Sequence, residues 1–89
     1  MGAYRVSLVV RFRPALSIAK QQAVLDCLEA LGPEDIDCTE VDCTIRYVTT
    51  ADRSSDASQD AETAVARALF DAGHTMLSAP ITSKSVEEL

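Results

Sequence analysis

Residues 4–13, which read YRVSLVVRFR, alternate between the two faces of an extended chain almost without interruption. Successive side chains of a strand point to opposite sides. One side carries the large apolar residues Tyr4, Val6, Leu8, Val10 and Phe12. The other carries Arg5, Ser7, Val9, Arg11 and Arg13. This pattern predicts a half-buried strand that ends before Pro14, because proline cannot donate a hydrogen bond to a sheet.

Two later segments have apolar residues at helical spacing. The first helix is predicted over 18–31, with Ser17 as its N-cap and Gly32 at its end. The second is predicted over 57–72, after a polar loop at 50–60. Its apolar side is a stripe of small and medium residues, Ala61, Ala64, Val65, Ala68, Leu69 and Ala72. Both helices therefore need a sheet that covers one side of each.

The segment 36–49 changes its alternating phase at Thr39 and Glu40. A side-chain period of two cannot absorb a slip of one residue without a turn or a bulge. We expect a short strand over 36–39, a tight turn and a longer strand over 41–49; the alternative is one long bulged strand. A last strand is expected over 74–81.

The expected order of elements is β-α-β-β-α-β. Right-handed crossovers place both helices on the same side of the sheet. The sequence thus predicts an α+β fold, a ferredoxin-like sandwich in which a four-stranded antiparallel sheet has two helices on one face. We expect a single domain over 1–82, followed by a short C-terminal tail over 83–89.

Charge and cysteine content narrow the class of protein. The formal net charge of −6 argues against nucleic acid and against an anionic membrane surface as partners. No apolar stretch approaches the ~18 residues of a membrane span, and no signal peptide is recognisable. The three cysteines, Cys27, Cys38 and Cys43, form an odd set, although Cys38 and Cys43 are five positions apart and could face each other across a hairpin. We therefore expect free thiols and a cytoplasmic location.

The face of the sheet away from the helices is the main candidate site. Its expected ligand or interface residues are Arg5, Ser7, Arg11, Arg13, Thr44 and Arg46. Guanidinium groups match carboxylate and phosphate well, so a small anionic ligand is one interpretation. A homodimer with sheets facing each other is the second, favoured by Val9 and Val48 on the same face. A plain solvated face is the third.

Other candidate chemistry is weak. RNA-binding modules of this fold stack bases on outward aromatic residues of the central strands, but Tyr4, Phe12 and Tyr47 fall on the core side. His74 is expected to cap the second helix. Cys38 and Cys43 have no tight zinc-type spacing, and the acids Asp35, Asp37, Glu40 and Asp42 have no EF-hand spacing. We assign no catalytic residue, no metal and no cofactor.

We expect a non-catalytic, self-associating binding or accessory module that uses the open sheet face. One alternative is a small dimeric α+β barrel enzyme of the monooxygenase or isomerase type, which would need a pocket beside Tyr47. Another is a regulatory domain that binds an effector, since ACT domains share the β-α-β-β-α-β order. The sequence RFRPALS has a proline after the first strand, as ACT domains do, but lacks their glycine.

Overall fold

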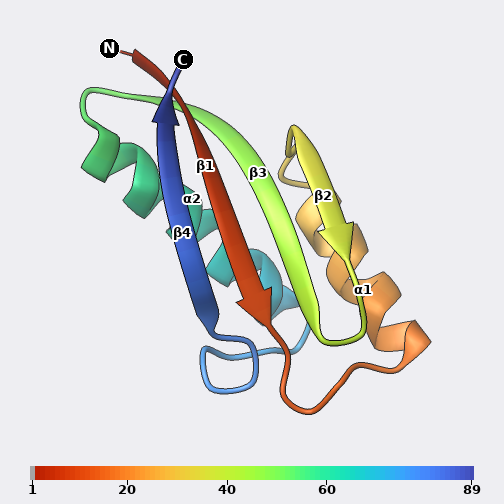
Figure 1. Cartoon of the computed structure of the whole chain (residues 1–89). Helices are drawn as coiled ribbons and strands as arrows, with labels where there is room; N and C mark the ends of the chain where they lie inside the picture. The colour runs from red at the N-terminus through yellow and green to blue at the C-terminus, as the bar shows by residue number, and fades with distance from the viewer. Residues whose placement is uncertain (1) are drawn as a thin grey trace.

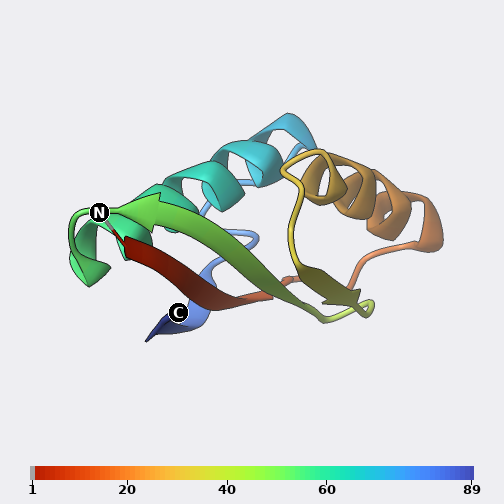
Figure 2. The same ribbon diagram turned by 90° about the horizontal axis from the view of Figure 1, so that it is seen from above.

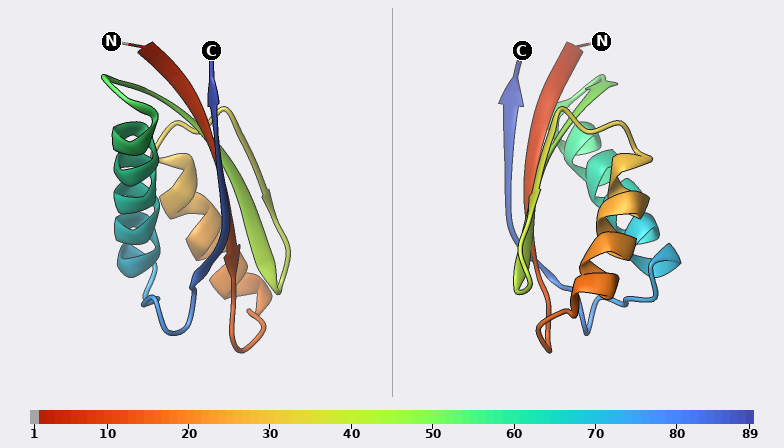
Figure 3. Two further views of the ribbon diagram at one scale, coloured as in Figure 1. Left: turned by 60° about the vertical axis from the view of Figure 1, so that its left-hand side comes forward. Right: turned by 90° about the vertical axis from the view of Figure 1, so that its right-hand side faces the viewer.

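The computed structural model describes residues 2–89 and consists of one sheet and two helices. The elements are β1 (Gly2–Arg11), α1 (Ile18–Glu29), β2 (Asp35–Cys38), β3 (Asp42–Ala51), α2 (Ser54–Asp71) and β4 (Ile81–Glu88). The strands form a four-stranded antiparallel sheet in the order β2-β3-β1-β4 (Figure 1). Both helices lie on the same side of this sheet (Figures 2 and 3), so the chain has an α+β fold with one open sheet face.

The central pair of strands, β1 and β3, carries most of the core. Their register runs without a shift from Gly2 opposite Ala51 to Arg11 opposite Asp42. The side facing the helices is fully buried at its centre, where Val6, Leu8, Val10, Cys43 and Ile45 are inaccessible to solvent. Tyr4 and Phe12 are also buried. The apolar face predicted from alternation in residues 4–13 is therefore confirmed.

Helix α1 begins where the sequence predicts. Ser17 has an extended backbone, and its hydroxyl accepts a hydrogen bond from the Lys20 amide at 3.3 Å, as an N-cap does. Val24 and Leu28 point into the core. Gly32 follows the helix with a φ of +68°, a conformation that a side chain would disfavour.

Helix α2 begins at Ser54, three residues before the predicted start. Its buried apolar stripe begins one turn before the predicted one, because Ala57, which precedes Ala61 by one helical turn, is fully buried. Asp56 in the first turn offers a negative charge to the positive end of the helix. The residues expected to form a polar loop thus supply the first turns of the helix, and only Asp52 and Arg53 connect it to β3.

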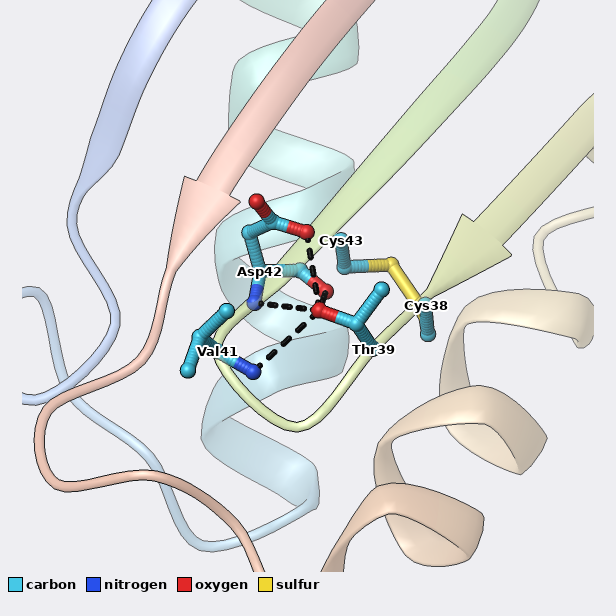
Figure 4. The surroundings of a disulfide bond; sticks show 5 residues. All are labelled: Cys38, Thr39, Val41, Asp42 and Cys43. Carbon is cyan, nitrogen blue, oxygen red and sulfur yellow. Dashed lines mark hydrogen bonds between the residues drawn. A yellow bond between two sulfur atoms is a disulfide. The ribbon is translucent and has the colours of Figure 1, made fainter.

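The hairpin predicted in the middle of the chain is confirmed, with β2 paired antiparallel to β3. The turn needs no glycine, because none of its residues has a positive φ. The Thr39 hydroxyl stabilises it by accepting hydrogen bonds from the amides of Val41 and Asp42 at 3.2 and 3.1 Å (Figure 4). Cys38 lies opposite Cys43, and the two form a disulfide. The expectation of free thiols at these positions is wrong; Cys27 remains a free cysteine.

The last strand is wrongly placed by the sequence analysis. Residues 74–80 form a loop in which Leu77 is 92% exposed. The strand is β4, which includes residues 83–88 of the expected tail. It pairs antiparallel with β1 although its side chains are mainly polar. Because β4 is an edge strand and mostly exposed, it needs no apolar alternation.

The disulfide gives the first testable prediction. The bond closes a loop of only a few residues, and its reduction increases the conformational entropy of the unfolded chain. Because the loop is short, reduction should lower the free energy of unfolding by only about 2 kcal/mol. Urea denaturation with and without a phosphine reductant measures the difference. In a Cys38→Ser variant the reductant should change nothing; an equal response of that variant would contradict the assignment to this bond.

Candidate functional site

The open sheet face is the side of the sheet away from the helices. It brings together four of the six residues predicted as a site. Ser7 lies opposite Arg46, and Val9 lies opposite Thr44, in the central β1–β3 ladder. Arg5 lies opposite Val48, diagonal to Arg46 and within reach of a long side chain. The centre of the predicted site is therefore formed by neighbouring side chains from two strands.

Each of the three guanidinium nitrogens of Arg5 donates to a carboxylate within the chain. Its Nε and Nη2 donate to the two carboxylate oxygens of Glu34 at 2.7 and 3.1 Å. Its Nη1 donates to Glu87, which lies directly opposite it on β4. Glu34 immediately precedes β2, so this one guanidinium links segments from both edges of the sheet. A bidentate pair of this kind is among the stronger side-chain contacts of a protein surface.

The Arg5–Glu34 pair shifts the pKa values of both groups. The hydrogen bond from Arg5 lowers the pKa of Glu34 below its ordinary value, helped by the charges of Arg5 and Arg46 and opposed by partial desolvation. The same hydrogen bond raises the pKa of Arg5. Both side chains are partly exposed, at 30% and 41%, so solvent screens the pair and its contribution to stability is small.

Arg46 also has a partner within the chain. Its Nη1 donates to Asp35 Oδ2 at 2.8 Å, across the β2–β3 pairing. A hollow of about 560 Å³ lies over this region, lined by Arg5, Ser7, Glu34, Arg46, Ser85, Val86 and Glu87. Its two guanidinium groups face two carboxylates, so its lining charges balance. The lining of this hollow therefore offers an anion no net positive charge.

The other two predicted residues lie elsewhere. Arg11 is six positions from Arg5 along β1, roughly 20 Å away at ~3.4 Å per residue. Arg13 lies beyond the end of β1, in the loop that leads to α1. The arginines of residues 4–13 therefore do not form one cationic patch. Alternation along the strand predicts the face that Arg5 occupies, but it does not predict Glu34 and Glu87, whose carboxylates neutralise the charge of Arg5.

The remaining candidates are placed as follows. His74 lies just after α2; its amide donates to the Leu69 carbonyl at 2.9 Å, and its ring packs against Phe12 with centroids 5.6 Å apart. Within residues 2–89, no group of three or more His, Cys, Asp or Glu side chains is arranged to hold a metal. Tyr47 does not line the hollow over the open sheet face.

No protein-family model, curated protein or solved structure matches this chain. Neither helix of residues 2–89 is long and apolar enough to cross a membrane. The disulfide between Cys38 and Cys43 removes the cysteine argument for a cytoplasmic location, because disulfides persist mainly in oxidising compartments.

The second prediction concerns Glu34. Replacing Arg5 by Gln should raise the pKa of Glu34 toward its ordinary value, because the largest cause of the lowering is the hydrogen bond from Arg5. Since the folded-state pKa is lowered, the pair stabilises the fold above the unfolded-state pKa, and this contribution disappears as pH falls through the folded-state value. Carboxyl ¹³C NMR titration measures the pKa directly.

Arg46→Gln is the matched control for this titration. Arg46 acts on Glu34 only through its charge and is the weakest of the causes, so its removal should raise the pKa of Glu34 less than removal of Arg5 does. A larger rise in the Arg46 variant would show that the hydrogen-bonded pair with Arg5 does not set the ionisation of Glu34.

Proposed function

We propose that the protein is a non-catalytic ferredoxin-like module that associates with a second copy of itself. The order of elements, the antiparallel sheet order β2-β3-β1-β4 and the position of both helices on one face support the ferredoxin-like description. The observation that carries self-association is the free edge of β4 (Ile81–Glu88), which is eight residues long and largely exposed.

The backbone of β4 is available on its outer side. Among residues 2–89, β4 pairs only with β1. The Leu89 amide donates to the Ala3 carbonyl at 2.9 Å, so the backbone at this position points toward β1. Because the direction alternates along an antiparallel strand, the N–H and C=O groups of Lys84, Val86 and Glu88 point outward. A row of unpaired backbone groups is a template for a further strand.

The side chains of the edge match a second copy in one register. Antiparallel pairing of β4 with its own copy, centred on Val86, places Val86 against Val86. The same register places Lys84 of each copy opposite Glu88 of the other, twice. A register shifted by four residues, and therefore centred on Lys84, would instead place Lys84 against Lys84. Opposite charges across a strand pair stabilise it and like charges oppose it, so the charges favour the register centred on Val86.

The edge is a better candidate than the open sheet face. On that face Arg5 and Arg46 already have carboxylate partners within the chain, and docking would desolvate pairs that water now screens. At the edge, Val86 is 36% exposed and gains an apolar neighbour. Lys84 Nζ donates to Glu62 Oε2 at 2.9 Å and has further donors for Glu88 of the second copy.

The third prediction tests this register by charge reversal. Lys84→Glu alone brings carboxylates together, and Glu88→Lys alone brings ammonium groups together, so each variant should form dimers more weakly than the unaltered chain. At about 0.5 kcal/mol per pair, two pairs turned from attraction to repulsion amount to about 2 kcal/mol, or about thirtyfold in Kd. Sedimentation equilibrium of each protein measures the Kd.

An equimolar mixture of the two variants is the matched control. In the mixed dimer both cross-strand pairs are again Glu opposite Lys, so association should return. The mixture also controls for the contact between Lys84 and Glu62, which the Lys84→Glu substitution breaks in every combination. An unaltered chain that stays monomeric at tens of micromolar, or a mixture no tighter than its components, rejects the proposed interface.

A further inference from the structure

A small hollow lies at one end of the sheet, between two loops that are far apart in sequence. The loop from β1 to α1 and the loop from α2 to β4 meet there, at the end opposite the chain termini (Figure 1). We call this the end hollow; its volume is about 180 Å³. It is lined by Arg13, Pro14, Ala15, Leu16, Lys20, Gly73, His74 and Ser78.

The lining of the end hollow is cationic in an acidic chain. It contains an arginine, a lysine and the single histidine, and it contains no Asp or Glu. The chain as a whole has 14 acidic residues against eight lysines and arginines. Lys20 belongs to the first turn of α1, where the positive end of the helix dipole adds to the same potential.

The cations of the end hollow are also unpaired. Four of the eight lysines and arginines, Arg5, Arg46, Arg53 and Lys84, form ion pairs with carboxylates. Arg13 and Lys20 form none within residues 2–89, and the ring of His74 contacts Phe12. An arginine and a lysine without carboxylate partners therefore line the same hollow, and the N–H donors of both are free to bind a ligand.

The backbone around the end hollow is fixed. The Arg13 amide donates to the Ser78 carbonyl at 2.9 Å, which joins the two loops directly. The Leu16 amide donates to the Glu40 carbonyl at 2.7 Å, and the side chain of Leu16 is buried. The Ser78 hydroxyl accepts from the Thr75 amide at 3.0 Å within its own turn. The hollow is thus a formed feature of the fold, and its cationic side chains are the groups left to bind a ligand.

We propose that the end hollow binds a single phosphate group, either inorganic phosphate or the phosphate of a small monoester. A drug-sized ligand needs a cavity of about 300–1,000 Å³, so this hollow has room for one small anionic group and little more. Arg13 supplies a planar pair of donors that matches phosphate oxygens, Lys20 supplies a second positive charge, and His74 supplies a ring nitrogen. This site is separate from the β4 edge and does not depend on self-association.

The test is an NMR titration of amide shifts with inorganic phosphate and, separately, with phenyl phosphate, at constant ionic strength set with chloride. Binding should give saturable shifts centred on Arg13, Lys20, His74 and Ser78. Tighter binding of phenyl phosphate identifies an ester as the preferred source of the phosphate, and equal or tighter binding of inorganic phosphate identifies the free anion. No saturable shift up to about 10 mM of either anion overturns the proposal.

Two variants with the same change in net charge locate the site. Arg13→Gln should weaken phosphate binding by about tenfold or more, because it removes hydrogen bonds to a charged ligand. Arg11→Gln, which removes an exposed arginine outside the end hollow, should leave binding within about twofold. Circular dichroism confirms that each variant is folded. Equal weakening by both variants would mean unspecific attraction to the basic chain segment and would overturn the site.

Discussion

The uninterrupted pairing of β1 with β3 is the constraint on which the rest of the structure depends. Because side chains alternate along a strand, one continuous register assigns every residue of both strands to a face. Val6, Leu8 and Ile45 then form a dry apolar surface that the helices cover. The same register places Arg5, Ser7 and Arg46 together on the opposite face. A bulge within this pair would move both the core residues and the arginines.

The elements that could be predicted are those whose own residues carry the signal. Alternation defines β1, the Ser17 cap defines the start of α1, and the phase change at Thr39 defines the hairpin. Strand β4 carries no such signal, because an edge strand is positioned by its backbone bonds to β1. The apolar alternation at 75–81 resembles a strand, yet residues 75–79 form a turn, in which the Ser78 and Ala79 amides donate to the Thr75 carbonyl at 3.2 and 2.8 Å.

Only part of the candidate site on the open sheet face could be predicted from the sequence. The local sequence determines which face Arg5 and Arg46 occupy, since that follows from alternation. It does not determine their partners, because Glu34 and Glu87 are separated from Arg5 by 29 and 82 positions. Only the folded chain brings these carboxylates over the open sheet face. The disulfide was missed for a related reason: the spacing of the cysteines allowed it, but the odd number of cysteines and the inferred compartment argued against it.

The protein has a net charge of −6, and the distribution of its ion pairs shows which of its cations have no carboxylate partner and could attract an anion. Arg5 and Arg46, near the centre of the sheet, both have carboxylate partners, which come from β4, from β2 and from Glu34 just before β2. The loops at the end of β1 differ, because the residues that line the end hollow include no acid. A phosphate bound there would meet unpaired Arg13 and Lys20 without first displacing a carboxylate. On the open sheet face it would have to compete with the bidentate Glu34 for Arg5, and this competition is why the proposed anion site lies at the loops and not on the arginine-bearing strand face.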